Sequence, residues 1–153
     1  MRQKHPVTVF IDSNVYDVGL ENPITNSFIV LRMALQRKIV PVAAILTVKE
    51  VGGYFRQSYG RNTGWLVEQF IRNLPNLIIE DEAKLKAETK ANQRRYKLEK
   101  EDASLLAVAK RQKADYFISL NRHFLKSRIQ KPHVLSPKDF CKRMQIQPIT
   151  DFE

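Results

Sequence analysis

The sequence predicts an α/β fold, a three-layer α/β/α sandwich with a mainly parallel central sheet. Short apolar segments rich in β-branched and aromatic residues alternate with longer segments of helical periodicity along the chain. The 153 residues, 43% hydrophobic and 27% charged, have the size and composition of one ordinary globular domain. Because the sequence contains no repeat, low-complexity tract or linker, we expect residues 1–153 to form a single domain.

The expected strands are short and mostly apolar, and they cover residues 8–11, 39–43, 77–79, 115–119 and 133–135. The segment 8–11 is nearly continuous in apolar character, which is typical of a strand buried on both faces. Pro41 cannot donate a ladder hydrogen bond, so it predicts an edge position for its strand or an early place within it.

The expected helices cover residues 25–37, 45–59, 63–74, 81–96, 101–112 and 136–144. Residues 17–22, with Gly19 among them, are expected to form a polar connector. In the second helix, Thr47 and Glu50 have the spacing of a capping box with Thr47 as the N-cap. Ser136 followed by Pro137 is typical of a helix start.

The chain is strongly basic. It has 26 Lys and Arg against 16 Asp and Glu, a formal net charge of +10 and a pI near 9.9. This excess favours a polyanionic partner, nucleic acid before membrane, although a merely basic soluble protein is an alternative. The single cysteine, Cys141, excludes an intrachain disulfide and a cysteine-based zinc site. Without a long apolar run or a signal peptide, we expect a cytoplasmic protein with no membrane contact.

Acidic residues follow strand ends or open helices at three places in this pattern. Asp12 comes directly after the first strand, Glu50 lies early in the helix after the second, and Asp102 opens the helix before the fourth. Asn121 follows that fourth strand. A parallel sheet brings the carboxyl ends of its strands to one edge, so these four side chains are expected to meet in one cleft. The alternatives are an Asx turn and helix cap for Asp12, the capping box for Glu50 and a simple first-turn acid for Asp102.

Three clustered carboxylates repel one another, and one of them would be forced to stay protonated. A hard divalent cation removes this repulsion. Ligands that are all oxygen suit Mg²⁺ or Mn²⁺, which bridge readily to a substrate phosphate.

Four motifs occur in the order found in one nuclease family. They are IDSNV near the start, the helix-opening Glu50 about forty residues later, EDASLLAVAK before a strand, and DYFISLNRHF across it. Over roughly residues 7–144 the chain resembles PIN-domain ribonucleases, and by its size it most resembles VapC-like toxins of toxin–antitoxin pairs. The resemblance implies that Asp12, Glu50 and Asp102 bind Mg²⁺ or Mn²⁺ and carry catalysis.

The resemblance also assigns supporting roles. Many family members have an aspartate where this chain has Ser119-Leu120-Asn121, so Asn121 is expected to act as a neutral ligand in the catalytic site. Ser13, Asn14 and Ser119 are expected to support it. The implied activity is an endoribonuclease that hydrolyses RNA phosphodiesters and leaves 5′-phosphate and 3′-hydroxyl ends.

The implied partners are RNA, an antitoxin protein and a second copy of the chain in a homodimer. Arg94, Arg95 and Arg122 are candidates for contacts with RNA phosphates. Tyr96 is a candidate for stacking on a base. An antitoxin segment would lie in a groove near Tyr54 and Phe55.

Other functions are compatible with the same residues. A catalytically weak RNA-binding module and a housekeeping RNA-processing nuclease both fit the charge and Asn121. A receiver-like signalling domain would need a second acid beside Asp12, and a phosphatase with a DxD strand end would need an acid at position 14, which is Asn. The three histidines, His5, His123 and His133, lack ligand spacing and receive no catalytic role.

Overall fold

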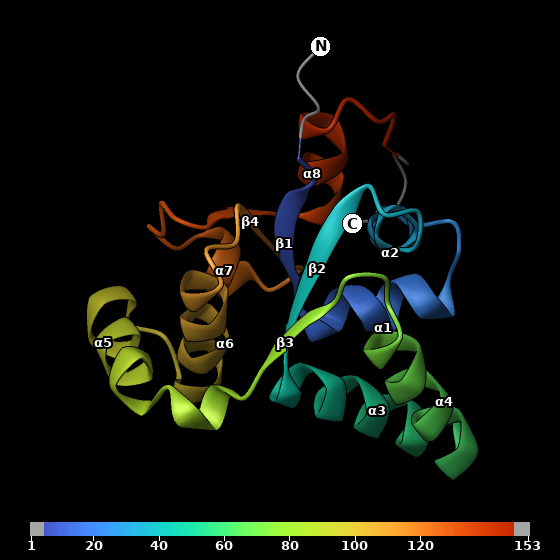
Figure 1. Ribbon diagram of the computed structural model, residues 1–153, viewed down its shortest axis with the longest axis horizontal. Helices are drawn as coiled ribbons and strands as arrows, with labels where there is room; N and C mark the ends of the chain where they lie inside the picture. The colour runs from blue at the N-terminus through green and yellow to red at the C-terminus, as the bar shows by residue number, and fades with distance from the viewer. Residues whose placement is uncertain (1–4, 149–153) are drawn as a thin grey trace.

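The computed structural model describes residues 5–148, which are built around a five-stranded sheet whose strands all run parallel (Figure 1). The strand order is β3-β2-β1-β4-β5. The strands are β1 (Val7–Ile11), β2 (Ile39–Ala44), β3 (Ile78–Glu80), β4 (Tyr116–Ile118) and β5 (His133–Leu135). Each predicted strand is confirmed to within two residues at either end. Because β1 is central, its carboxyl end lies in the middle of one edge of the sheet.

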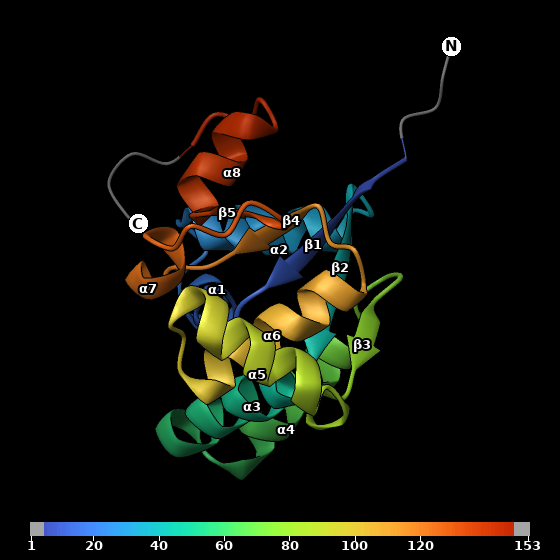
Figure 2. The same cartoon turned by 90° about the vertical axis from the view of Figure 1, so that its left-hand side faces the viewer.

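Helices cover both faces of the sheet. They are α1 (Ser13–Glu21), α2 (Asn26–Leu35), α3 (Ile45–Tyr59), α4 (Arg61–Arg72), the 3₁₀ helix η1 (Glu82–Lys84), α5 (Lys86–Tyr96), α6 (Lys100–Arg111), α7 (Arg122–Leu125) and α8 (Pro137–Arg143). Helices α5 and α6 lie on one face, and α1, α2 and α8 lie on the other (Figures 1 and 2). The α3–α4 hairpin extends below the carboxyl edge. The predicted three-layer α/β fold is confirmed.

The alternation of side chains along β1 divides the core into two. Val9 and Ile11 are fully buried among apolar residues of α1, α2 and α8. Phe10 points to the opposite face, where its ring stacks on Phe117 of β4 at a centroid distance of 4.7 Å. Successive residues of a strand face opposite sides of the sheet. The apolar run in β1 therefore serves both cores.

Residues 17–22 do not form the predicted connector, since α1 begins directly after Asp12 and continues to Glu21. Gly19 is the reason that the helix packs closely. A β-carbon at this position would lie 2.9 Å from Leu31 Cδ1 and 3.0 Å from the backbone nitrogen of Phe28, both in α2. Gly19 thus permits the contact between α1 and α2 and does not mark a turn.

Pro41 is the third residue of an interior strand, so the edge position is wrong, whereas the alternative of an early place in the strand agrees with the structure. Its register partner on β1 is Val9, whereas the pairing of β2 with β3 begins only at Val42. At Pro41 the strand therefore has a neighbour on one side only. The missing N–H costs no ladder hydrogen bond to β3.

The α3–α4 hairpin is tightly packed at two glycines. A β-carbon on Gly52 would meet the Glu68 side chain at 2.3 Å, and one on Gly64 would meet Arg56 Cβ and the Gly52 carbonyl oxygen at 2.8 Å. Gly53, in contrast, has nothing within 4 Å. The expected loop between the two helices is reduced to Gly60, whose φ of 96° favours glycine.

One more helix differs from expectation, and another agrees with it. The helix predicted over 81–96 is split into η1 and α5, with Leu85 between them. Ser136 caps α8 and Pro137 opens it, as the sequence predicts. Over residues 5–148, every helix is too short or too polar to cross a bilayer.

Candidate active site

Asp12 lies where β1 passes into α1, at the centre of the carboxyl edge. Its backbone N–H donates to the Ile118 carbonyl of β4 at 3.0 Å, which extends the sheet by one bond. Its Oδ1 accepts the Ser13 N–H at 2.8 Å, so Asp12 is the N-cap of α1. Only 4% of the residue is exposed. The capping role considered for Asp12 is real, and it fixes the carboxylate in place.

Ser119 connects this carboxylate to the end of β4. The fully buried Ser119 hydroxyl donates to Asp12 Oδ2 at 2.7 Å and accepts the Asn121 N–H at 2.9 Å. Asn14 adds a longer bond from its amide to Asp12 Oδ2 at 3.3 Å, and its own oxygen accepts the Leu120 N–H at 3.1 Å. The residues predicted to support Asp12 thus lie around it in one network.

Glu50 is the sixth residue of α3 and has an exposed side chain. The predicted capping box is wrong, because the N-cap of α3 is Ala44 and Thr47 lies inside the first turn. The Thr47 hydroxyl accepts the Ala44 N–H at 3.4 Å, and Glu82 of η1 accepts the Leu46 N–H. Glu50 therefore has no part in capping its helix.

The acids of this edge influence one another's protonation. Burial raises the pKa of Asp12, and the charge of Asp102 adds to this rise, although hydrogen bonds from Ser119 and Ser13 oppose it. Partial desolvation raises the pKa of Glu50 to about 7, assisted by the charges of Asp12, Glu101 and Asp102. Because the Glu50 side chain is exposed, solvent moderates this effect.

Asp102 completes the set at the first turn of α6. Desolvation raises its pKa, and the charges of Glu99 and Glu101 act in the same direction. His123, at the start of α7, is close enough to lower it. The three acids predicted from the sequence are therefore electrostatically coupled at one edge, with a histidine beside them.

Asp17 belongs to the same electrostatic group and was missed by the sequence analysis. Its Oδ1 is buried and has no hydrogen-bond partner. Desolvation, together with the charges of Glu21 and Asp12, raises its pKa to about 7. The signal that could have found it is the helical spacing of the buried residues Val15, Tyr16 and Gly19, which extends α1 through this position.

Asn121 has a structural role in this arrangement. Its side-chain oxygen accepts the His123 N–H at 2.9 Å and so caps α7. The oxygen that was expected to serve as a neutral ligand is used in this bond. Its role as a ligand remains a prediction.

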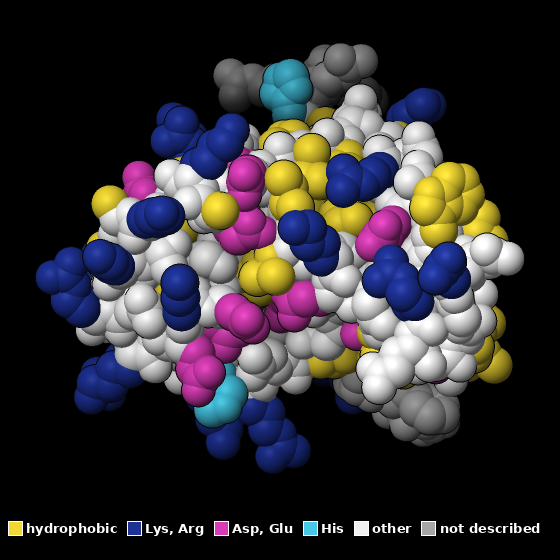
Figure 3. Space-filling model, turned by 90° about the horizontal axis from the view of Figure 1, so that it is seen from below, with side chains coloured by type: hydrophobic (Ala, Val, Ile, Leu, Met, Phe, Trp, Pro, Cys, Tyr) yellow, Lys and Arg dark blue, Asp and Glu magenta, His cyan; other side chains and the backbone are white. Residues whose placement is uncertain are grey.

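Cations surround the acidic edge. Figure 3 looks onto it from below and shows Asp and Glu side chains gathered in the middle of the face, with Lys and Arg side chains around them. Arg122, Arg94 and Arg95 are all exposed, and Arg122 follows Asn121 directly. Phe55, predicted beside a partner groove, is instead buried in the core. Tyr54 is exposed and donates to Glu21.

The donor set of this edge fits a hard divalent cation in its chemistry. It offers carboxylate oxygens only, and burial, assisted by repulsion between the acids, raises their pKa values. Asp17 Oδ1 is buried without a hydrogen-bond partner. As the side chains stand, no group of three or more His, Cys, Asp or Glu within residues 5–148 is arranged to hold a metal ion.

Solved structures of toxin–antitoxin proteins share this fold. A chain of a toxin–antitoxin complex from Klebsiella pneumoniae is 17% identical, with a TM-score of 0.62 over 84% of this chain and 97% of that one. A chain of VapBC2 from Rickettsia felis, bound to a promoter DNA fragment, is 12% identical, with a TM-score of 0.63 over 85% and 98%. VapC20 from Mycobacterium tuberculosis, a toxin that cleaves the sarcin–ricin loop, is 15% identical, with a TM-score of 0.55 over 71% and 86%.

No family model matches the sequence, and no protein of curated function matches it either. The likeness is therefore one of fold. It agrees with the fold expected from the four sequence motifs.

Proposed function

We propose that this protein is a metal-dependent endoribonuclease that acts in the cytoplasm as the toxin of a toxin–antitoxin pair. The observation that carries the proposal is the buried Asp12 carboxylate at the end of the central strand, coupled by charge to Glu50 and Asp102. The fold shared with VapC20 and with chains of two toxin–antitoxin complexes supports it. The charge of +10 favours a polyanionic substrate.

Asp12, Glu50 and Asp102 would hold Mg²⁺ or Mn²⁺, and Asp17 is a further carboxylate whose charge acts on Glu50. Such an ion supplies a water of lowered pKa and neutralises charge on a scissile phosphate. Asp12 is fixed by its bonds to Ser13 and Ser119, whereas Glu50 is exposed and free to change its rotamer. Rotation of Glu50 and Asp102 toward Asp12 would form the shell that the resting side chains do not make.

The residues of the chain contribute three further effects. The Ser119–Asn14 network holds the Asp12 carboxylate in one orientation, which reduces reorganisation during reaction. In the metal-free protein the pKa of Glu50 is raised to about 7, so a Glu50 carboxylate outside the metal shell would be suited to accept a proton from an attacking water. Arg122 is exposed directly after Asn121 and would bind a substrate phosphate.

The experiment is a cleavage assay on fluorophore–quencher RNA with added Mg²⁺ or Mn²⁺, and with EDTA. Wild-type protein should cleave only with the divalent ion, and Asp12→Asn should not cleave. Induced expression in a bacterial host should arrest growth for the wild type and not for Asp12→Asn. Metal-independent cleavage, or equal growth arrest by the variant, would contradict the proposal.

A catalytically weak RNA-binding module is the second candidate. It is favoured by Asn121, whose side-chain oxygen is used to cap α7, and by the absence of a ready-made metal shell within residues 5–148. Tight RNA binding without cleavage under any divalent ion would establish this candidate. Cleavage without growth arrest would instead indicate a housekeeping nuclease.

The α3–α4 hairpin offers a surface for the proposed antitoxin. Trp65 and Leu66 of α4 are 57% and 59% exposed, and Tyr54 and Tyr59 of α3 are 40% and 55% exposed. Large exposed apolar side chains on one hairpin are typical of a protein-binding surface. The same surface could serve a homodimer, so light scattering of the purified chain should be compared with that of Trp65→Ser.

A further inference from the structure

A cationic pocket lies at the edge of the sheet opposite the acids. It has a volume of about 690 Å³ and is lined by five cations, Arg95, Lys110, Lys113, Arg128 and Lys131. Lys113 lies just before β4, and Lys131 lies just before β5. Because all strands are parallel, these positions mark the amino edge, whereas Asp12 and Ser119 mark the carboxyl edge. The pocket is therefore separate from the candidate active site.

The positive charge of the pocket is not neutralised by the protein. Within residues 5–148, ion pairs join only Arg56 to Glu68 and Arg111 to Glu80. The one acid in the lining, Asp115, accepts the Thr8 N–H at 2.8 Å with its carboxylate. Five cations with a single carboxylate among them raise the free energy of the unliganded protein and favour an anionic ligand.

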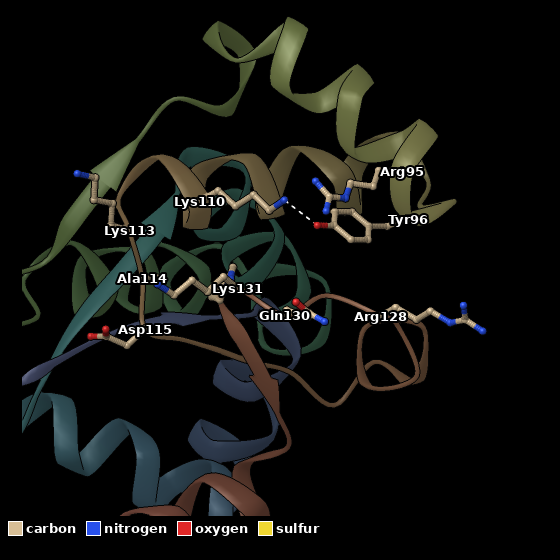
Figure 4. A pocket seen from close by; sticks show the side chains of 10 residues that line it. Arg95, Tyr96, Lys110, Lys113, Ala114, Asp115, Arg128, Gln130 and Lys131 are labelled. Atoms are coloured by element: carbon tan, nitrogen blue, oxygen red, sulfur yellow. Dashed lines mark hydrogen bonds between the residues drawn. The ribbon is translucent and has the colours of Figure 1, made fainter.

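Tyr96 positions two of these cations. Lys110 Nζ donates to the Tyr96 hydroxyl at 2.9 Å and lies 4.6 Å from the ring centroid, and Arg95 Cζ lies 5.5 Å from it (Figure 4). These cation–π contacts occupy the ring that was expected to stack on a base. The pocket is consequently suited to phosphate groups more than to bases.

Two smaller hollows extend the pocket toward the acids. The first shares Arg95, Tyr96 and Arg128 with the pocket and adds Lys97 and Lys126. The second shares Lys97 and Lys126 and reaches Arg122 and His123. His123 is close enough to Asp102 to lower its pKa. A continuous cationic track thus runs from the pocket to the acidic edge.

We propose that this track and the pocket bind the phosphate backbone of a single-stranded RNA whose scissile bond lies at the acids. This inference rests on the proposed function. A free phosphate or mononucleotide would occupy only the pocket and would leave the cations of the track without a ligand. A flexible single strand can follow a path from one edge of the sheet to the other, whereas a stiff duplex cannot bend so sharply.

The test is binding of fluorescent single-stranded RNA in EDTA, which prevents cleavage. The pocket variant is Lys110→Gln, Arg128→Gln and Lys131→Gln. The matched control, Lys38→Gln, Arg72→Gln and Lys142→Gln, removes the same charge from exposed positions on other elements. Three lost phosphate contacts should reduce the slope of log affinity against log salt by about 2, at about 0.7 per contact on a single strand. At 0.1 M salt that slope corresponds to a loss of affinity of about 100-fold.

Chain length distinguishes a track from an isolated anion site. The pocket variant should weaken binding of a 24-nucleotide RNA strongly, because only a long strand spans the pocket and the acids. A 4-nucleotide RNA covers only part of the track, so the pocket variant should lose much less affinity for it than for the long RNA. Inorganic phosphate and AMP should compete only at concentrations far above that of the long RNA. An equally large loss for AMP as for the long RNA would show a free-anion site and overturn the proposal.

A second variant leaves Lys110 unchanged, because loss of its contact with Tyr96 could disturb the fold. Arg128→Gln with Lys131→Gln changes only exposed side chains and should reduce the salt slope by about 1.4. Pocket and control variants that bind the long RNA identically would overturn the inference, even if the wild type cleaves RNA. Pocket-dependent binding by a wild type that never cleaves would overturn the proposed function alone.

Discussion

The two edges of the sheet carry opposite charge, and they are built differently. At the carboxyl edge, Asp12 and Ser119 are buried and joined by hydrogen bonds of defined geometry. At the amino edge, Arg128 and Lys131 are exposed and have no carboxylate partner within residues 5–148. A buried network depends on each of its members, whereas exposed cations contribute separately and nearly additively. Single substitutions should therefore be severe at the first edge and graded at the second.

The largest expected effect is that of Asp12→Asn. The substitution keeps one oxygen, which can still accept the Ser13 N–H and cap α1. The new amide NH₂ then faces Ser119, whose hydroxyl must accept where it now donates, and the charge is removed. Cleavage should fall by at least about 10²-fold, the scale of losing one stabilising group at a reacting centre. The melting temperature should not fall, because burial already raises the pKa of this acid. A variant that unfolds at lower temperature would show that the charge of Asp12 is structural.

Ser119→Ala should destabilise the fold by about 1–3 kcal/mol, because it leaves Asp12 Oδ2 and the Asn121 N–H without their shared partner. Urea unfolding followed by circular dichroism measures this. Ser104→Ala is the matched control, since the Ser104 hydroxyl bonds only to the Glu101 carbonyl of its own helix. Equal midpoints for the two variants would refute the role of Ser119 as a connector.

Gly64→Ala and Gly53→Ala test the packing of α3, the helix that carries Glu50, against α4. The added methyl at position 64 would lie 2.8 Å from Arg56 Cβ and the Gly52 carbonyl, so a loss of about 1–3 kcal/mol is expected. At position 53 nothing lies within 4 Å, and alanine should stabilise the helix by up to about 1 kcal/mol. Thermal unfolding of both variants measures whether each is more or less stable than the wild type. A change of the same sign in both would contradict the close packing of α3 on α4.

The free energy of unfolding should depend on pH, because two acids at the carboxyl edge have raised pKa values. Folding raises the pKa of Glu50 from 4.5 to about 7 and that of Asp17 from 3.8 to about 7. The folded state therefore binds protons more tightly than the unfolded state between these values, and the free energy of unfolding falls as pH rises from about 4 through 7. Because both side chains are partly solvated, the melting temperature of the metal-free protein should drop by only a few °C, on the order of 1 kcal/mol.

Two further experiments test this dependence of stability on pH. Mg²⁺ should restore more stability at pH 8 than at pH 5, since Glu50 and Asp17, with pKa values of about 7, are mostly charged only at the higher pH. Asp17→Asn should flatten the pH profile by removing one of the two groups. A melting temperature that rises with pH in EDTA would contradict the coupling of these acids.

The smallest effect on stability is expected for Asn121→Asp, because aspartate caps a helix as well as asparagine does. The change should leave the unfolding free energy within about 0.5 kcal/mol. It adds a charge to the edge and should lower the Mg²⁺ concentration needed for half-maximal cleavage. An unchanged Mg²⁺ dependence would mean that residue 121 acts as a cap alone.

The strands were predictable because their signal is local. Continuous apolar runs marked β1 and β4, and parallel pairing then brought Asp12, Glu50 and Asp102 to one edge. The helix α1 was not predictable in the same way, because Gly19 signals a turn in sequence, and only the proximity of α2 reveals its packing role. Asp17 was missed for this reason.

The cap of α3 and the cationic pocket show a second limit of local patterns. Thr47 and Glu50 match a capping box, but the chain passes from β2 into α3 without a turn, so Ala44 takes the cap position. The pocket gathers side chains from α5, α6 and the segments before β4 and β5. Its charges are far apart in sequence, and only the topology places them together.

The contact between Gly52 and Gly64 has a consequence for how substitutions spread through this protein. Glu50 lies two residues before Gly52, on the helix whose position this contact fixes. A larger side chain at position 64 would tilt α3 and carry Glu50 away from Asp12 without altering any charged group. The distance between α3 and α4 thus sets the distance between Glu50 and Asp12. Substitution of an uncharged residue far from the candidate active site can therefore reduce activity.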